Sequence, residues 1–150
     1  MQEARGNLWD EPCDLRVITT NGATRKDGAA IMGRGCALEA KQRFPGIDLK
    51  LGRLIQQHGN RVMRLAKLTD GSVLASYPVK HHWKEEADPA LIERSAHQLV
   101  ALANTFGQTN VLLPRPGCGS GRLSWGEVKP LLESILDERF TVITYPKDKL

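Results

Sequence analysis

Apolar and polar positions along the 150-residue chain follow two different periods. Short runs of β-branched and other apolar residues, each ended by turn residues, predict buried strands at 15–20 (LRVITT), 110–114 (NVLLP) and 140–145 (FTVITY). The stretch 61–79 holds two further strand-like runs on either side of Asp70-Gly71. That dipeptide is typical of a tight hairpin turn, so we predict that this pair is antiparallel.

Four other segments have apolar residues at helical spacing, and they cover about 35–44, 47–59, 88–106 and 124–136. Asp88 is placed to cap the third helix, and Ser124 with Glu127 forms a capping box at the fourth. Because strands and helices alternate outside the hairpin, we predict an α/β fold in three α/β/α layers, with a mixed, mostly parallel sheet flanked by helices. In such folds, ligands bind where loops gather at the carboxyl ends of the strands.

Composition limits the class of protein without naming its function. A chain of 150 residues with 41% hydrophobic residues supports one core, so we expect a single domain over 1–150. The net charge of +4 permits a polyanionic partner, although acidic residues are interspersed with the basic ones. Cys13, Cys36 and Cys118 lack disulfide or zinc spacing, which favours reduced thiols in a cytoplasmic protein without a metal. No apolar run approaches the ~18 residues of a membrane span, so we expect no membrane contact.

Two glycine-rich stretches each lead into a predicted helix. The first, MGRGCA (32–37), precedes helical amides that have no internal partner and therefore favour a phosphate. The second, PRPGCGSGRLSW (114–125), has Gly117, Gly119 and Gly121 at alternate positions, as a nest of amides around a phosphate requires. Both stretches also fit tight turns with close packing and no ligand, and the sequence leaves the two interpretations open.

Lys80 follows a predicted strand within YPVKHHW (77–83). A lysine at such a loop is usually a solvated charge, although the nearby Trp83 and two histidines make the segment unusual. His81 and His82 would point to opposite faces of an extended chain, and no Asp, Glu or Cys joins them at ligand spacing. We therefore expect no metal site here.

In their order along the chain, four elements resemble those of macrodomains, the ADP-ribose-binding α/β/α modules, over about residues 6–145. They are GNLW (6–9), VITTN (17–21), MGRGCA (32–37) and PRPGCGSGRLSW (114–125). The spacing of Pro78, Lys80 and Trp83 is similar to a motif in one branch of that family. This branch contains the antitoxins that reverse DNA ADP-ribosylation and the related ADP-ribosyl-glutamate glycohydrolases.

The resemblance implies a ligand contact for each matched position. Asn7, where the family usually has Asp, would lie at the adenine, and Tyr145 would pack against the same base. Asn21 would face the distal ribose. The glycine loops would approach the diphosphate and that ribose through Gly33, Gly35, Gly117, Cys118, Gly119, Ser120 and Gly121.

The resemblance also implies a reaction. Lys80 would reach the anomeric carbon of the distal ribose, which the lysine of related glycohydrolases is thought to attack. Glutamate-directed relatives have an Asp where this chain has Gly121, whereas the DNA-directed antitoxins resemble this chain. We therefore expect a glycohydrolase that removes ADP-ribose from a modified nucleic-acid base, without a cofactor. Its substrate would be ADP-ribosylated single-stranded DNA, and its partner a cognate ADP-ribosyltransferase. Two alternatives remain: a module that binds ADP-ribose without turnover, and a hydrolase of a small ADP-ribose derivative.

Overall fold

A six-stranded sheet organises the computed structural model, which describes residues 1–145. The strands are β1 (Gln2–Arg5), β2 (Leu15–Asn21), β3 (Met63–Lys67), β4 (Val73–Lys80), β5 (Val111–Pro114) and β6 (Phe140–Thr144). Their order across the sheet is β1-β6-β5-β2-β4-β3. All neighbours are parallel except β3 and β4, which form the predicted antiparallel hairpin.

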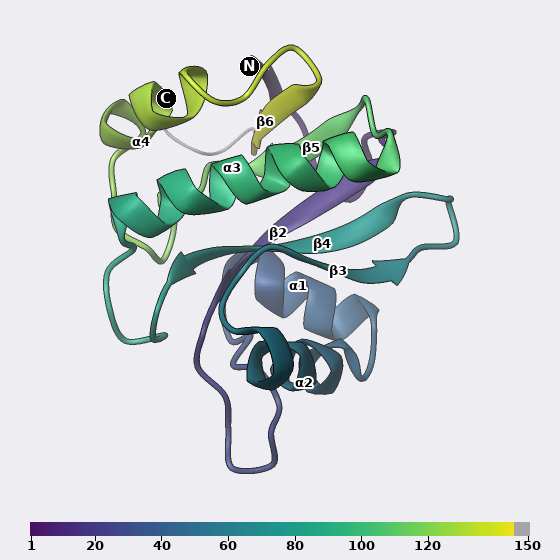
Figure 1. Cartoon of the computed structure of the whole chain (residues 1–150), viewed down its shortest axis with the longest axis vertical. Coiled ribbons are helices and arrows are strands. Elements are labelled where there is room, and N and C mark those ends of the chain that lie inside the picture. Colours follow the sequence, from purple (N-terminus) through teal and green to yellow (C-terminus); the bar gives the residue numbers. More distant parts are fainter. Residues whose placement is uncertain (146–150) are drawn as a thin grey trace.

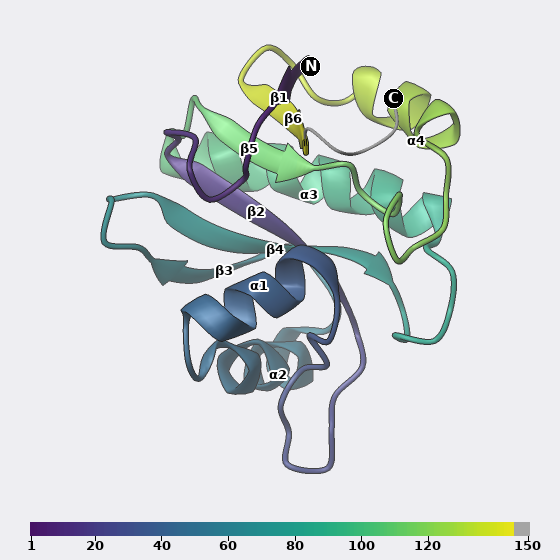
Figure 2. The ribbon, with the colours of Figure 1, turned by 180° about the vertical axis from the view of Figure 1, so that it is seen from behind.

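Four helices cover the two faces of the sheet (Figures 1 and 2). They are α1 (Gly35–Arg43), α2 (Ile47–His58), α3 (Pro89–Phe106) and α4 (Trp125–Glu133). The helix α3 lies in front of the strands in Figure 1, whereas α1 lies in front of them in the reverse view of Figure 2. Each face has its own buried cluster, represented by Tyr77 and Leu99 on one side and by Leu51 and Leu74 on the other. The predicted α/β/α layering is thus confirmed.

Local signals fixed the starts of α3 and α4 and the hairpin turn as predicted, whereas α4 ends at Glu133, before the predicted end at about residue 136. The Asp88 carboxylate accepts a hydrogen bond from the amide of Ala90 at the start of α3. Ser124 and Glu127 form the complete capping box of α4. Gly71 in the hairpin turn has a φ of +89°, a left-handed conformation that glycine adopts without strain.

The edge strand β1 was not predicted. All four of its residues are exposed, so no apolar run marks it in the sequence. It pairs in parallel with β6, and its neighbouring amino terminus donates a hydrogen bond to the carbonyl of Leu136. Within residues 1–145, no helix combines the length and the apolar character needed to cross a membrane.

Arg16 is an unusual core residue because its side chain is only 2% exposed. It donates hydrogen bonds to the carbonyls of Leu8 and Glu11, and it forms an ion pair of 2.8 Å with Asp70. The side chain therefore joins the segment after β1 to the hairpin turn between β3 and β4, because both of its terminal nitrogens donate to protein oxygens.

Candidate functional site

A cavity of about 780 Å³ opens at the carboxyl ends of the central strands. Its walls come from the end of β2, the segment 31–37 at the start of α1, the end of β4 and the loop 114–121 after β5. The two glycine-rich stretches and Lys80 therefore share one rim, as the parallel connections suggested. The volume lies within the range of about 300–1,000 Å³ that is usual for sites of small ligands.

The amino-terminal end of α1 faces this cavity with its amides uncapped. The N-cap residue, Arg34, makes no side-chain capping bond, and the first turn contains no acidic residue. Gly35 has a φ of +57°, and a β-carbon at Gly33 or Gly35 would meet no atom within 4 Å. The partial positive charge of the helix end and the open backbone together favour an anionic ligand at this wall.

The three glycines of the loop 117–121 have different physical reasons for being glycine. A β-carbon at Gly117 would lie 2.7 Å from Cδ1 of Ile92, and one at Gly121 would lie 2.5 Å from the carbonyl oxygen of Gly117. A β-carbon at Gly119 would meet no atom within 4 Å. Packing therefore explains Gly117 and Gly121, whereas only a ligand close to the main chain gives Gly119 a comparable reason.

The main-chain amides of this loop are available to a ligand. Among the described residues, no protein group accepts a hydrogen bond from the amides of Gly119, Ser120 or Gly121. The loop is nevertheless held in place, because the amide of Leu123 donates to the carbonyl of Gly117 at 2.9 Å and the amide of Ala87 donates to that of Gly121 at 3.0 Å. Such a fixed set of unpaired amides is suited to phosphate oxygens.

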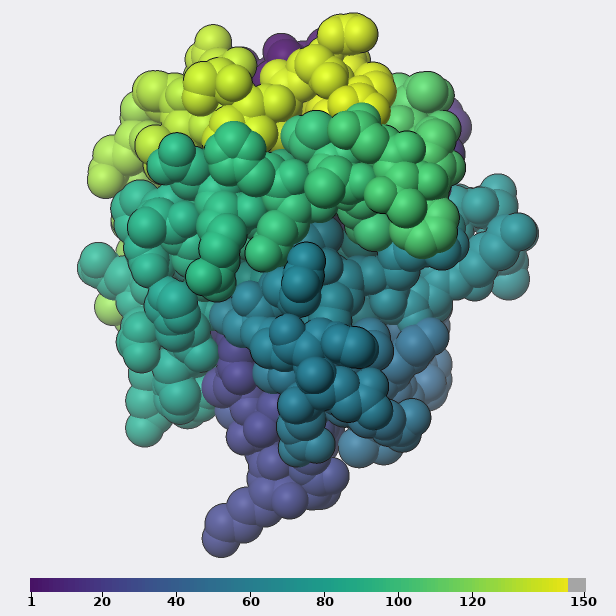
Figure 3. Space-filling view, in the orientation of Figure 1, coloured from purple at the N-terminus to yellow at the C-terminus, as the bar shows by residue number. Residues whose placement is uncertain are grey.

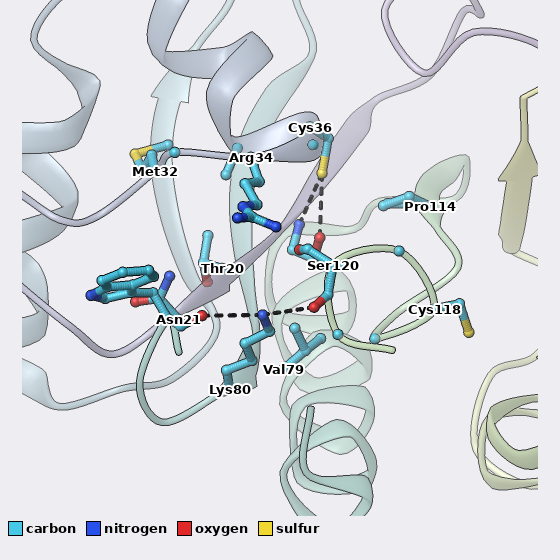
Figure 4. A pocket seen from close by; sticks show the side chains of 18 of the residues that line it. Thr20, Asn21, Met32, Arg34, Cys36, Val79, Lys80, Pro114, Cys118 and Ser120 are labelled. Atoms are coloured by element: carbon cyan, nitrogen blue, oxygen red, sulfur yellow. Dashed lines mark hydrogen bonds between the residues drawn. The ribbon is translucent and has the colours of Figure 1, made fainter. Parts of the chain in front are cut away.

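Lys80 is the last residue of β4, and it is only 8% exposed. The usual interpretation of a solvated loop lysine is therefore wrong for this chain. The ammonium group donates to the carbonyl oxygen of Ser120 at 2.9 Å and to that of Trp83 at 3.4 Å. Figure 4 shows the side chain extending from β4 towards the loop that holds Ser120, with Arg34 reaching in from the start of α1. Lys80 thus joins two walls of the cavity.

Burial lowers the pKa of the Lys80 amine below its ordinary value, and repulsion from the charges of Arg122 and Arg34 lowers it further. Arg25, which is ion-paired with Asp27 at 3.1 Å, and Arg115 also line the cavity, and no acidic residue among residues 1–145 does. Arg25 lies on the loop between β2 and α1, which projects from the body of the molecule at the bottom of Figure 3. The site therefore combines a multiply cationic wall with an amine that loses its proton more readily than a free lysine.

Asn21 lies directly beside Lys80, because the two residues are register partners at the ends of β2 and β4. Its side-chain amide donates to the carbonyl of Ile31 at 3.0 Å, and its side-chain oxygen accepts from the amide of Ala23 at 2.9 Å. Asn21 lines the cavity and at the same time shapes the loop that leads to Gly33.

Ten of the eleven residues expected at the ligand line this cavity, and Asn7 does not. The Tyr145 hydroxyl donates to the carboxylate of Glu39 at 3.2 Å, at the end of the cavity formed with Ile143. The Asn7 side-chain oxygen instead accepts from the amide of Trp9 at 2.9 Å, which closes the turn after β1. An adenine contact by Asn7 stays a prediction, and it has no support from the cavity walls.

Several wall residues were not expected from the sequence. Arg34 lies between the two glycines of MGRGCA, a motif that predicts a role for its main chain only. Cys36 is buried in the wall, where its sulfur accepts from the amide of Thr19 at 3.3 Å, and burial raises the pKa of its thiol. Within residues 1–145, no three His, Cys, Asp or Glu side chains are grouped as a metal site requires.

The chain is similar to several curated proteins, although no family model matches it. It is 26% identical over 138 residues to the DNA ADP-ribosyl glycohydrolase of Thermus aquaticus, covering 89% of this chain and 37% of that protein. It is 27% identical to a DNA ADP-ribosyl transferase-DNA ADP-ribosyl glycohydrolase fusion protein of Thermosipho africanus, covering 68% of this chain and 31% of that protein. It is 27% identical to the human ADP-ribose glycohydrolase OARD1, covering 75% of this chain and 74% of that protein. The chain thus spans only about 37% of the Thermus protein's length.

Solved structures agree on the architecture. The macrodomain of Mycobacterium tuberculosis DarG superposes with a TM-score of 0.77 at 23% identity, covering 98% of this chain and 97% of that one. Thermosipho africanus DarTG in complex with ADP-ribose gives a TM-score of 0.75 at 22% identity, covering 97% of this chain and 41% of that one. At these identities the likeness is one of fold.

Proposed function

We propose that this chain, which is a macrodomain by its fold, binds ADP-ribose in the cavity and hydrolyses the bond between the distal ribose and a nucleic-acid base. The observation that carries the proposal is the buried Lys80, whose ammonium group lies 2.9 Å from the carbonyl of Ser120 in the loop suited to phosphates. The relatives named as glycohydrolases support it. Residues 1–150 would form one domain with this activity.

The diphosphate would lie between the start of α1 and the loop 117–121. Both walls present amides to the ligand, at Gly33 and Gly35 on one side and around Gly119 on the other. Two phosphates fit this arrangement better than one, because each wall can hold its own phosphate. The cations lining the cavity add long-range attraction for the same group.

Lys80 would then act on the anomeric carbon of the distal ribose. Its lowered pKa leaves a larger neutral fraction near neutral pH than an ordinary lysine has, and only the neutral amine can attack carbon. Attack forms a bond between Nζ and C1″ and releases the base, and water then breaks the new bond and restores the lysine. In total one water is consumed, giving its hydroxyl to C1″ and its proton to the base.

The substrate side of the proposal rests on charge. A carboxylate near the reaction centre would assist a neighbouring lysine in proton transfer, but this chain has Gly121 at the matching place and, within residues 1–145, no acid in the cavity wall. A nucleic-acid base leaves more readily when it is protonated, so a water or the substrate's own phosphate would have to supply that proton here. The net charge of +4 is compatible with a nucleic-acid substrate.

The proposal extends to partner and location. The fusion protein from Thermosipho africanus joins a transferase to a glycohydrolase in one chain, which supports an ADP-ribosyltransferase as the cognate partner here. Cys13, Cys36 and Cys118 are all free thiols, and this supports a cytoplasmic location, because thiols stay reduced there.

The decisive experiment compares wild type with Lys80→Ala and Lys80→Met on an ADP-ribosylated single-stranded oligonucleotide. We expect both variants to lose at least ~100-fold in release of ADP-ribose, the scale of a catalytic proton-transfer or nucleophilic group. Calorimetry should show ADP-ribose affinity within a few-fold of wild type, because the proposed diphosphate contacts are main-chain amides. Lys50→Ala, which removes an exposed lysine of α2, serves as the control and should match wild type.

Each alternative function gives a different result. A binding module would bind ADP-ribose but release nothing from the oligonucleotide or from a protein carrying ADP-ribosyl-glutamate. A hydrolase of small derivatives would act only on compounds such as ADP-ribose 1″-phosphate. Equal rates for wild type and Lys80→Ala on the oligonucleotide would remove Lys80 from the mechanism.

A further inference from the structure

We propose that Trp83 is a stacking platform for the unpaired nucleobase that carries the ADP-ribose, so that the site accepts a base from single-stranded nucleic acid. The inference rests on the proposed function, because it deepens the description of the same site. It starts from one exposed aromatic ring. Trp83 is 42% exposed although it lines the cavity, and the other large hydrophobic residues exposed in the described part of the chain, Leu49 and Phe106, do not line it.

Trp83 is fixed next to the reaction centre through its main chain. Its carbonyl oxygen accepts a hydrogen bond from the Lys80 ammonium group at 3.4 Å. If Lys80 Nζ reaches C1″, a base bonded to C1″ must lie beyond that carbon, within about the width of one ring. Because Trp83 lines the same cavity three positions after Lys80, its exposed indole would be in reach of that base, whereas the adenine at the other end of the ligand would lie towards Tyr145.

The loop around Trp83 is anchored at both ends. The carbonyl of Lys80 accepts from the Asn60 side chain at 3.0 Å and from the amide of Gly22 at 3.2 Å. At the other end, the amide of Asp88 donates to the carbonyl of Val79 at 2.9 Å. A ring carried by an anchored loop loses less conformational freedom when it stacks on a ligand than a ring on a free loop.

The contacts that the indole makes within the protein are weaker than the stacking of a nucleobase would be. The His82 ring lies 5.9 Å from it at an interplanar angle of 28°, and the Lys84 ammonium group lies 5.2 Å from its centroid. An exposed cation–π contact changes an equilibrium by a factor of about 2 to 5, whereas stacking of a base on an aromatic side chain is worth about 5- to 150-fold. A base would therefore displace Lys84, and the freed ammonium group would remain near the backbone phosphates of the strand.

The chemistry of the platform selects the class of substrate. A base in a duplex has both faces covered by its neighbours, so only an unpaired or extruded base can stack on Trp83. An ADP-ribosylated Asp or Glu side chain presents no aromatic face at all. The loop also carries Glu85 and Glu86, which disfavour contact with a long stretch of phosphates. We therefore expect Trp83 to contact one base and not an extended strand.

The test measures binding without turnover, so it remains informative if the catalytic proposal fails. In a Lys80→Ala background, which loses the contact to the Trp83 carbonyl but keeps the main-chain anchors at both ends of the loop, we compare the affinity for an ADP-ribosylated single-stranded oligonucleotide with that for free ADP-ribose. We expect the oligonucleotide to bind at least tenfold more tightly. Trp83→Ala should reduce this ratio about tenfold, whereas Trp83→Phe should preserve most of it, because a phenyl ring still offers a face. Phe106→Ala, which removes an equally exposed aromatic residue outside the cavity, should leave the ratio unchanged.

Two outcomes would overturn the inference. One is a ratio near one in the Lys80→Ala background, which would show that the base adds no affinity. The other is a ratio that Trp83→Ala leaves unchanged; if both affinities then fall by the same factor, Trp83 contacts the ADP-ribose moiety itself. Absence of turnover by wild type would contradict only the proposed reaction.

Discussion

Two substitutions in the loop 117–121 should separate ligand binding from folding, because the space beside the glycines differs. Gly119→Glu places a side chain where a β-carbon meets no protein atom within 4 Å, so we expect the protein to fold. Its carboxylate would point into the cavity that is proposed to hold the diphosphate. Gly121→Ala is the matched change, since its β-carbon would lie 2.5 Å from the carbonyl oxygen of Gly117 and 2.8 Å from Cβ of Ala87.

The expected magnitudes follow from charge and overlap. One carboxylate at ~5 Å from one phosphate charge, at an effective dielectric constant near 20, costs about 3 kcal/mol. Even with partial compensation by Lys80 and Arg34, Gly119→Glu should weaken ADP-ribose binding by at least ~100-fold. Gly121→Ala overpacks a backbone contact, which costs roughly 1–3 kcal/mol of folding free energy. For a chain of this size, that lowers Tm by about 3–10 °C.

Two measurements on each purified variant check this reasoning. Calorimetric titration with ADP-ribose should show lost binding for Gly119→Glu, and thermal unfolding should show a lowered Tm for Gly121→Ala. Gly119→Ala is the control for backbone freedom and should differ little from wild type in Tm. If Gly119→Glu binds ADP-ribose normally, or if it unfolds the chain, the ligand-based explanation of Gly119 is refuted and a structural turn explains all three glycines.

Two further predictions concern the pH dependence of the reaction and the contribution of the buried Arg16 to stability. Because the pKa of Lys80 is lowered in the ligand-free protein and the neutral amine attacks, kcat/KM should rise with pH and reach its plateau below the ordinary lysine value of 10.5. A kcat/KM that instead falls over that interval would indicate that the ammonium form protonates the leaving base. Arg16→Ala leaves the buried carbonyl of Leu8 and the partly buried carbonyl of Glu11 without their donor, so the unfolding free energy should fall by about 2–4 kcal/mol in chemical denaturation. Arg53→Ala, which removes an exposed arginine, is the control and should be near neutral.

Much of this fold could be predicted from short stretches of sequence, because helix caps, turns and apolar runs are local signals. The caps at Asp88 and Ser124, the Asp70-Gly71 turn and the apolar runs each act within a few residues, so no knowledge of distant segments was required. The edge strand β1 escaped prediction for the same reason. Its four residues are exposed, and the parallel pairing with β6 that makes it a strand joins opposite ends of the chain.

Only part of the candidate site could be predicted from the sequence. Glycine patterns indicated two phosphate-binding loops, and the family resemblance implied a catalytic role for Lys80. The sequence did not separate the packing glycines Gly117 and Gly121 from the open Gly119, since that difference depends on Ile92 and Ala87 from another segment. It also gave no sign that the Asn7 side chain would close a local turn instead of lining the cavity.

The tertiary structure decided what Lys80 can do. Its partner Ser120 lies 40 positions away in the chain, and the charges that lower its pKa come from Arg122 in the loop of Ser120 and from Arg34 at the start of α1. Burial and charge repulsion depend on these distances in space, which cannot be obtained from the separation of residues along the sequence. The amino-acid sequence by itself determined which segments become strands, helices and glycine loops. Only their assembly at one edge of the sheet turned an ordinary surface lysine into a buried amine with a lowered pKa, because desolvation and charge repulsion act through space.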